Sequence, residues 1–393
     1  MSKSYSLQEY RVGVMIMDVE GKNSDCFHQW VSQAAESFKN IIADTLGIKV
    51  ELLAFEGPHL MPSAGTYAPL DFLQIGMSEK LERNIHFLLI VTEVDLSTTT
   101  FSYTLALPSQ LTNVGIISTK RLNPAFWGDS KNDSLVVQRL TTLLLHTFGH
   151  LLNLSRTENP QNIMYDFADV EALAAMVHIT DKQRQRMRKT LPQEAHERKS
   201  RKGHWKFILS TLFRDWRSIA RAVIKANPFQ LVTRLPTMIT AALSVIIVVF
   251  FSAEVWDVAS AVELYQLVLF SGVAVVAATV VLNRAFAFSS VLGRGRVLAE
   301  STVVTSAATI LCLLITMLIL FATFVGLTYL GTITIFPRKL METWPTVDPA
   351  VRVLDHVKLS LFVAALGVLA GSLGGRADSK DLVRGVLFVN KEM

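Results

Sequence analysis

The sequence predicts a protein in two parts, a soluble α+β part followed by an α-helical membrane part of about four helices. In the first half of the 393 residues, strand-like and helix-like hydrophobic patterns alternate and charged residues occur throughout. From Leu235 onward, long apolar stretches without a charged side chain follow one another. We therefore divide the chain into a soluble domain at 1–192, a basic linker with a surface helix at 193–234, a membrane domain at 235–375 and a tail at 376–393.

The elements of the soluble domain follow from hydrophobic periodicity and from its turn residues. Strands are predicted at 11–19, 48–55, 85–94, 101–107 and 114–119, and helices at 27–46, 134–154, 169–177 and 180–191. Asp133 or Ser134 is the expected cap of the long helix, and Thr180 with Gln183 forms a capping-box start for the last one, which should end before Pro192.

The long helix carries the residues with chemical interest. His146 and His150 are four residues apart, so they share one helix face and can bind a single metal ion. A hydrolytic zinc helix of this kind also has Glu directly after the first His, as general base, and a third His after a turn. Thr147 and Arg156 occupy those two places.

Three segments together resemble metzincin-type zinc peptidases, archaemetzincins in particular. They are the segment 121–128 (Arg-Leu-Asn-Pro-Ala-Phe-Trp-Gly), the His146/His150 helix, and Asn-Ile-Met164-Tyr165, which is similar to the Met-turn that lies beneath the zinc. The resemblance covers about residues 10–190. It implies a zincin-like α+β fold, with a twisted mixed sheet, an active helix and a C-terminal helical subdomain.

The sequence departs from that pattern at the residues that carry the chemistry. An arginine has no lone pair for a metal, and a hydroxyl is a poor base near neutral pH, so Arg156 and Thr147 cannot replace the usual residues. Asn153 stands where a glycine is usual, and asparagine tolerates the left-handed turn. The cysteines of a second zinc site in archaemetzincins are absent, with Thr157 and Asn162 at the first two places.

Three interpretations stay open for the histidine pair. The domain can be a pseudo-peptidase that kept the fold, a true zinc enzyme with Asp166 or Glu158 as third ligand, or a domain in which the two histidines are core residues. Arg156 beside the histidines could also form a site for a carboxylate or phosphate. We expect zinc to be weakly bound or absent, and we leave the question of enzymatic activity open, with the balance against it.

The membrane part rests on four uncharged stretches, at 235–253, 264–283, 302–337 and 359–375. The loop at 283–300 carries three arginines against one acid, whereas the loop at 254–263 carries three acids and no Lys or Arg. This bias predicts a multi-pass protein with the N-terminal domain and the C-terminus in the cytoplasm. Gly367, Gly371 and Gly375 form a stripe that would allow close helix packing, within the bundle or between two copies in a homo-oligomer.

A strongly basic segment precedes the first apolar stretch. Residues 182–225 contain 14 Lys or Arg against three acids, a net charge of +11, while the whole chain carries +5. This predicts a helix at 205–226 on the membrane surface, with anionic lipids as partners. Nucleic acid is not an expected partner, because no binding motif accompanies the charge. The two cysteines, Cys26 and Cys312, exclude a disulfide framework, and no cleavable signal peptide is expected at the start of this sequence.

These observations favour a membrane-anchored pseudo-peptidase that acts as a binding, scaffolding or sensing module at the cytoplasmic membrane face, with a peptide or protein as its partner. The alternative is a membrane-bound zinc metallopeptidase with a non-standard third ligand. A transporter is disfavoured, because the apolar stretches contain no ionisable side chain.

Overall fold

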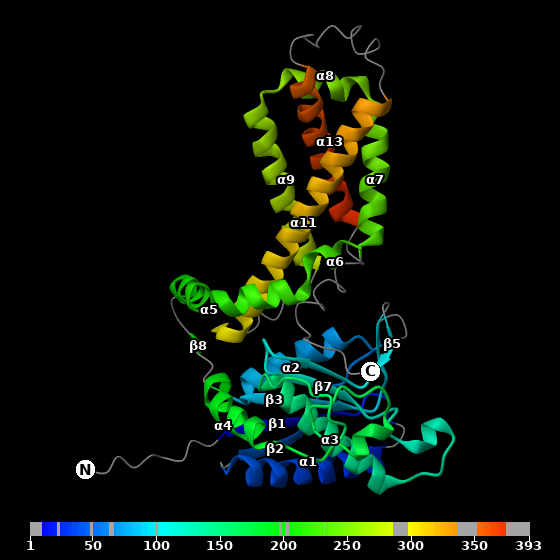
Figure 1. The fold of residues 1–393 in the computed structure, drawn as a ribbon, viewed down its shortest axis with the longest axis vertical. Helices are drawn as coiled ribbons and strands as arrows, with labels where there is room; N and C mark the ends of the chain where they lie inside the picture. Colours follow the sequence, from blue (N-terminus) through cyan, green and yellow to red (C-terminus); the bar gives the residue numbers. More distant parts are fainter. Residues whose placement is uncertain are drawn as a thin grey trace, which may run out of the picture. The chain divides into compact units, whose positions relative to one another are not determined.

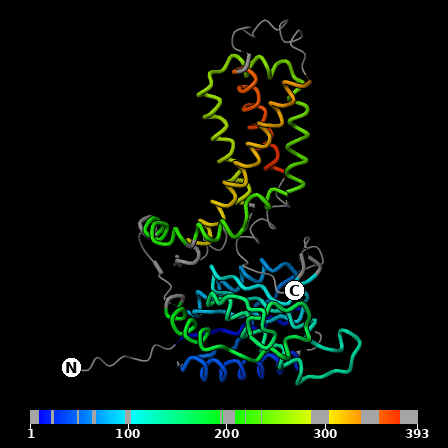
Figure 2. The backbone as a smooth tube through the Cα atoms, viewed as in Figure 1, coloured from blue at the N-terminus to red at the C-terminus, as the bar shows by residue number. Residues whose placement is uncertain are grey.

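The chain forms two compact units in the computed structural model. One unit comprises residues 1–210, 294–303 and 387–393, and the other comprises residues 211–293 and 304–386 (Figures 1 and 2). The described residues are 10–21, 24–47, 50–62, 67–98, 101–195, 199–200, 204–233, 235–285, 298–335 and 352–374. Gly375 and the predicted tail at 376–393 lie outside them.

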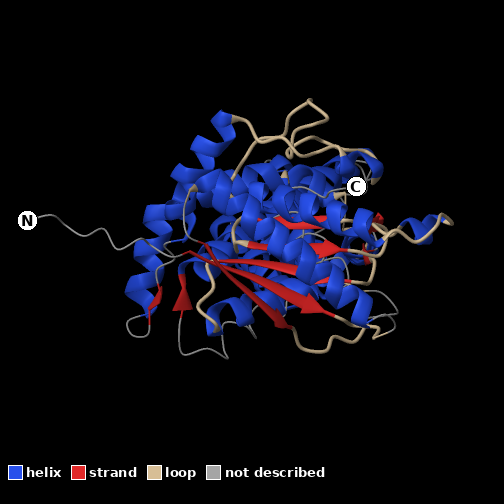
Figure 3. Cartoon of the chain, turned by 90° about the horizontal axis from the view of Figure 1, so that it is seen from below, coloured by secondary structure: helices blue, strands red, loops and turns tan. Residues whose placement is uncertain are grey.

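A five-stranded mixed sheet is the centre of the first unit. Its strands are β1 (Tyr10–Met17), β2 (Val50–Glu56), β3 (Phe87–Thr92), β6 (Ala106–Ser109) and β7 (Val114–Ser118). They lie in the order β2-β1-β3-β7-β6; β2, β1, β3 and β7 run parallel, and the edge strand β6 is antiparallel to β7. The strands fan out with the usual sheet twist (Figure 3). The predicted mixed-sheet fold class is confirmed.

Helices cover both faces of this sheet, and the alternation of side chains along β3 shows how. Phe87, Leu89 and Val91 point into the main core, together with side chains of α1 (Ser24–Leu46) and α3 (Asp133–Leu151). Leu88 and Ile90 face α2 (Pro69–Glu82), where Gly76 allows the helix to approach closely, since a Cβ there would stand 2.6 Å from Ile90 Cδ1. The central strand is therefore buried on both faces, as a parallel strand in a covered sheet should be.

Several predicted elements have different bounds. The strand expected at 101–107 is broken at Leu105: β5 (Phe101–Thr104) pairs with β4 (Leu96–Thr98), and β6 joins the main sheet. Helix α2 was not predicted, because its two faces differ little in hydrophobicity. The cap of α3 is Asn132, whose side chain accepts a hydrogen bond from the Leu135 N–H, and neither Asp133 nor Ser134 fills that place.

The segment after α3 is largely as expected. The short helix predicted at 169–177 is a single 3₁₀ turn, η2 (Glu171–Ala174). Thr180 and Gln183 exchange both capping-box hydrogen bonds, so the predicted start of α4 (Asp181–Ala195) is confirmed. However, α4 continues through Pro192, where the sequence predicts its end. A two-residue strand, β8 (Lys199–Ser200), follows and pairs antiparallel with β9 (Leu298–Ala299).

The second unit is helical. It contains α6 (Pro228–Val232), α7 (Pro236–Phe250), α8 (Ala253–Ala261), α9 (Leu264–Ala285), α13 (Arg352–Gly374) and most of α5 (His204–Ala226) and α11 (Glu300–Ile335). Among the described residues, three helices are long and apolar enough to cross a membrane, at Leu264–Arg284, Val303–Ile335 and Leu354–Gly374. The α7–α8 pair makes a fourth crossing only if the two bent helices count as one span.

The first predicted apolar stretch needs correction, and the form of the third is now defined. The first was expected to be one helix over 235–253, but α7 has 15 residues and the chain turns by 85° into α8. At 1.5 Å per residue, α7 is about 22 Å long, shorter than the roughly 30 Å of bilayer hydrocarbon. The third stretch forms one unbroken helix of 36 residues, α11, about 54 Å long, so it extends beyond the hydrocarbon or tilts strongly.

Contacts among these helices give their relative directions. Gly371 lies against Met238 near the start of α7, whereas the Lys358 ammonium donates to the Ser260 carbonyl at the end of α8. Helix α13 therefore runs antiparallel to α7. The glycine stripe is used within the chain: a Cβ at Gly367 would stand 2.6 Å from Ile246, and one at Gly371 would stand 2.9 Å from the Met238 carbonyl.

Candidate functional site

Helix α3 is held in place by its apolar face. The Phe148 ring packs edge-to-face against Phe38 of α1 and Phe87 of β3, with centroids 5.5 and 5.4 Å apart. At its end, the Gln110 amide donates to the His150 carbonyl over 2.6 Å, which ties the helix to the β6–β7 turn. His146 and His150 lie on a different side of the helix from Phe148. The core thus fixes the orientation of the histidine face.

The two imidazoles contact each other directly. His146 is fully buried and His150 is almost so, and their Nε2 atoms are 3.2 Å apart. His146 Nδ1 lies 2.5 Å from the Ile163 carbonyl. Because a carbonyl only accepts, Nδ1 carries the proton, and a neutral His146 presents its Nε2 lone pair to His150.

The segment after α3 passes beneath this pair. Asn153 adopts the left-handed conformation with φ 59°, so the backbone path predicted for this position is confirmed. Met164 is fully buried, and its backbone N–H donates to the Asn162 side chain. A Cβ on Gly149 would stand only 2.5 Å from the Met164 sulfur. The close packing of this turn on α3 therefore requires glycine at position 149. Tyr165, the next residue, is half-buried.

Thr147, at the place of the general base, is directed at the sheet. It is fully buried, and its methyl group lies against Gly115 of β7, where a Cβ would be 2.4 Å away. The Thr147 hydroxyl oxygen has no hydrogen-bond partner among the described residues. A residue in this position can fill space between helix and strand, but it has no means of activating a water molecule.

Arg156, at the place of the third ligand, forms an ion pair with Asp166. The Arg156 side chain is 28% exposed and that of Asp166 is 61% exposed, so the pair lies at the surface. Of the two residues considered as third ligands, Asp166 is bound to the Arg156 guanidinium and Glu158 is exposed to solvent.

The donor set fits part of a zinc site. Two Zn–N bonds of about 2.0–2.1 Å at a tetrahedral angle place the nitrogens about 3.3 Å apart, close to the distance between the two histidines. No group of three or more His, Cys, Asp and Glu side chains within the described part of the chain is arranged to hold a metal. The pair therefore offers two corners of a tetrahedron, and the residues for the third ligand and the base do not fit a hydrolytic site.

Asn162, one of the two residues that the resemblance placed at missing cysteine positions, takes part in amide hydrogen bonds. Asn162 and Gln183 exchange two side-chain hydrogen bonds of 2.9 Å, both buried, and Gln183 also caps α4. Thr157 donates its backbone N–H to the Met164 carbonyl. This network connects the Met164 turn to α4 without cysteine or metal.

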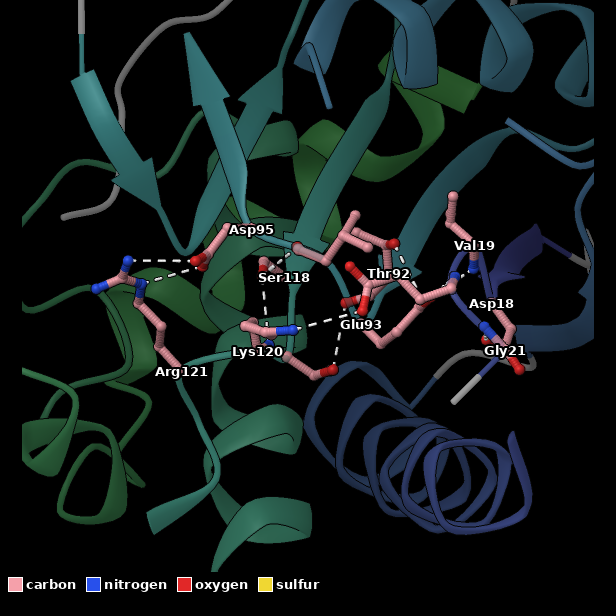
Figure 4. A network of polar contacts seen from close by, with 12 residues as sticks. Asp18, Val19, Gly21, Thr92, Glu93, Asp95, Ser118, Lys120 and Arg121 are labelled. Carbon is pink, nitrogen blue, oxygen red and sulfur yellow. Dashed lines mark hydrogen bonds and ion pairs between the residues drawn. The ribbon is translucent and has the colours of Figure 1, made fainter. Parts of the chain in front are cut away.

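A second polar cluster lies at the carboxyl ends of β1, β3 and β7 (Figure 4). Glu93 accepts hydrogen bonds from the backbone N–H groups of Val19 and Glu20. Burial raises the pKa of Glu93 above its ordinary value, Asp18 raises it further, and the backbone hydrogen bonds oppose this increase. Sequence reasoning did not select Glu93; the acidic residues directly after a buried strand were the available signal.

Arg121 belongs to the same region and to the segment 121–128. Its guanidinium makes two hydrogen bonds of 3.0 and 3.2 Å to Asp95 (Figure 4). It also stacks 3.6 Å above the centre of the Tyr103 ring. The Trp127 indole donates to the Arg121 carbonyl, and half of the Trp127 surface is exposed. These contacts fix the segment 121–128 in place before α3 begins.

Comparisons with known proteins agree with the resemblance seen in the sequence. No protein-family model matches the chain. Over 75 residues, the chain is 29% identical to archaemetzincin of Thermococcus kodakarensis, a match that covers 19% of this chain and 40% of the relative. Over 75 residues it is 31% identical to archaemetzincin of Pyrococcus furiosus, covering 19% and 39%. The chain thus spans about two-fifths of the length of the curated relatives it matches.

Solved structures give a weaker likeness. Archaemetzincin of Methanopyrus kandleri has a TM-score of 0.38 and 14% identity, over 47% of this chain and 96% of that one. A zinc-dependent peptidase of Methanocorpusculum labreanum has a TM-score of 0.36 and 18% identity, over 45% and 99%. At these scores the likeness adds nothing to the segment match. Over the matched 75 residues the chain is similar to archaemetzincins, and in that resemblance the third-ligand and base positions hold Arg156 and Thr147.

Proposed function

We propose that the chain is a membrane-anchored pseudo-peptidase, a binding, scaffolding or sensing module in which the archaemetzincin-like domain recognises a peptide or protein and does not cleave it. The observation that carries this proposal is the Arg156–Asp166 ion pair at the position of the third ligand. It combines a fixed positive charge, which repels a divalent cation, with the removal of the nearest carboxylate.

The state of Thr147 supports the same conclusion. A general base must reach a water molecule beside the metal, but the Thr147 side chain is fully buried against Gly115. The two losses are independent, since one concerns the metal and the other concerns proton transfer. Restoring either residue alone would not restore hydrolysis.

The second candidate is a membrane-bound zinc metallopeptidase with an unusual third ligand. It is favoured by the 3.2 Å distance between the two Nε2 atoms, which suits two ligands of one ion, and by the similarity to archaemetzincins. In this case Asp166 would have to leave Arg156 in order to bind the metal. The hydrogen bond from His146 to the Ile163 carbonyl would orient the ring in either function.

An activity measurement separates these two functions. The purified full chain, supplied with zinc, is incubated with a mixture of unstructured peptides, and cleavage is followed by mass spectrometry beside the His146→Ala variant. We expect both proteins to give the same background. Cleavage by the parent chain that disappears in His146→Ala and in Asp166→Asn would support the metallopeptidase and contradict the pseudo-peptidase.

We also propose a cytoplasmic location for the archaemetzincin-like domain and for the C-terminus. The arginines of the segment 283–300 and the acids of the segment 254–263, which is mostly helix α8, support this orientation, because cytoplasmic segments of membrane proteins are enriched in Lys and Arg. A partner of the domain would then be a cytoplasmic peptide or protein.

A further inference from the structure

Helix α5 carries an exposed apolar stripe. Leu209 and Phe213 lie four residues apart before a kink at Asp215, and Trp216 and Ile224 lie eight residues apart after it, so each pair shares one side of its own helical segment. The four side chains are 54%, 81%, 58% and 77% exposed. Exposed aromatic and aliphatic side chains are common one at a time, but four so close together mark a contact surface. The side chains of Trp205 and Phe207, which the sequence also suggested for this surface, lie outside the described ones.

A cationic stripe lies directly beside the apolar one. Arg214, Arg217, Arg221 and Lys225 are all exposed and follow at spacings of three and four residues. Thr211 before the kink and Ile219, Val223 and Ala226 after it are buried. The described part of α5 thus combines exposed apolar, exposed cationic and buried side chains.

The position of α5 in the chain indicates what binds its exposed apolar and cationic side chains. A left-handed turn at Asn227 ends α5, and after the short helix α6 the apolar helix α7 begins at Pro236. Phe229 of α6 is also 71% exposed. The part of α5 that belongs to the second unit, from Thr211 onward, lies crosswise to the bundle helices (Figure 1). A helix tethered this closely to a membrane-spanning helix meets the lipid surface before any soluble partner.

We propose that α5 binds the surface of a bilayer that contains anionic lipids. The apolar stripe, centred on Phe213 and Trp216, enters the boundary between headgroups and acyl chains, and the cationic stripe pairs with phosphate or carboxylate groups of the lipids. The excess of positive charge matches an anionic surface and suits neither a neutral bilayer nor a cationic partner. This proposal is independent of whether the histidine pair holds zinc.

Site-directed spin labelling of the full chain tests the proposal. The native cysteines are replaced by Cys26→Ser and Cys312→Ala, and a nitroxide is attached at Phe213→Cys, with Arg217→Cys as matched control on the cationic stripe. The proteins are reconstituted into vesicles of phosphatidylcholine alone or of equal parts phosphatidylcholine and phosphatidylglycerol. Accessibility to oxygen, which concentrates in lipid, is compared with accessibility to a water-soluble nickel complex.

In the mixed vesicles we expect the label at position 213 to favour oxygen over nickel severalfold more than the label at position 217. A label at Ile224→Cys should behave like the one at 213. Equal nickel accessibility at 213 and 217 would overturn the proposal, since the apolar stripe would then lie in water. Protection of position 213 from both reagents would also overturn it, because a protein and not lipid would cover the stripe.

The lipid composition tests the electrostatic part. The label at 213 should lie deeper in the mixed vesicles than in pure phosphatidylcholine, and replacing Arg214, Arg221 and Lys225 by glutamine should remove that difference. If the depth is the same in both vesicles and in the glutamine variant, recognition of anionic lipid is contradicted.

Discussion

The Nε2 atoms of the buried His146 and His150 lie 3.2 Å apart, while the residue at the third-ligand position, Arg156, is paired with Asp166. Two imidazoles without a third ligand hold zinc far more weakly than a complete site does. We therefore expect the purified full chain to bind zinc weakly and below one equivalent, measured by elemental analysis and by titration calorimetry.

The matched control for this measurement is the double variant His146→Ala, His150→Ala. It should differ little from the parent chain in zinc content. One tightly bound zinc per chain in the parent, lost in the double variant, would show that another residue completes the site and would contradict the pseudo-peptidase.

A second prediction concerns the third-ligand position itself. Arg156→His removes the cation and offers a third imidazole, so we expect zinc affinity to rise at least tenfold, about 1.4 kcal/mol or more in binding free energy. Arg156→Gln removes the charge without adding a ligand and should give a smaller increase. Equal affinities in the two variants would mean that residue 156 cannot reach the histidines.

Stability should change little in both variants. The ion pair that they break is at the surface, and exposed pairs contribute about 0–1 kcal/mol to the free energy of unfolding. A much larger loss of stability in Arg156→Gln would indicate that Arg156 has a structural role in the turn after α3. Thermal unfolding of the same protein samples gives this value.

The packing of Met164 on Gly149 gives a third prediction. Gly149→Ala would place a Cβ 2.5 Å from the Met164 sulfur, so the buried methionine must move. Overpacking of this kind costs about 1–3 kcal/mol, more than the roughly 1 kcal/mol that alanine gains over glycine in a helix. We expect a net loss of stability in thermal or denaturant unfolding.

A double-mutant cycle isolates this contact. In a Met164→Ala background the overlap no longer exists, so Gly149→Ala should become neutral or stabilising. An equal cost of Gly149→Ala in both backgrounds would show that the Met164 turn does not lie against this part of α3.

Local features of this site follow from the sequence, whereas contacts between distant segments do not. The left-handed turn at Asn153 and the capping box of Thr180 and Gln183 depend on local backbone chemistry, and both were predicted correctly. The Arg156–Asp166 pair depends on how the chain returns after α3, which no periodicity encodes. Asp166 was therefore considered a metal ligand, whereas the structure pairs it with the neighbouring arginine.

The same distinction applies to the fold. Buried strands such as β3 and long helices such as α3 have strong patterns and were predicted within a few residues. Helix α2 was missed because its buried side includes Gly76 and Lys80, so the sequence shows no clear amphipathic pattern. Gly76 is the residue at which α2 packs closely against the sheet. The bend between α7 and α8 was missed as well, since the apolar sequence continues through it.

The raised pKa of Glu93 leads to a fourth prediction. The folded protein holds the Glu93 proton more tightly than the unfolded chain, so this group contributes stability below its ordinary pKa of 4.5 and loses it as the pH rises through the raised value. Glu93→Gln cannot titrate. The parent chain should therefore lose stability relative to Glu93→Gln as the pH rises from below 4.5 through the raised pKa of Glu93.

Thermal unfolding of both proteins over this pH range measures the difference. A difference that stays constant, or one that increases in favour of the parent chain as the pH rises, would contradict the prediction. The latter result would mean that the hydrogen bonds from Val19 and Glu20 outweigh the effect of burial on Glu93.

The last prediction concerns the number of membrane crossings. β8, before α7, pairs with β9, after α9, so both must lie on the same side of the membrane. An even number of crossings must therefore separate them, and α9 supplies one. The bent pair α7–α8 should supply the other, although α7 alone is short. With α11 and α13 this gives four crossings, with both termini on one side.

Cysteine labelling of the full chain in sealed, inside-out vesicles tests this arrangement. In the background Cys26→Ser, Cys312→Ala, a membrane-impermeant maleimide should modify Lys131→Cys in the soluble unit, and a protease should remove a tag fused to the C-terminus. Glu254→Cys, at the start of α8, should react only after the vesicles are opened, because α7 places it on the opposite side. If Glu254→Cys reacts in sealed vesicles and the tag is protected, α7–α8 does not cross the membrane, three crossings remain, and the two termini lie on opposite sides.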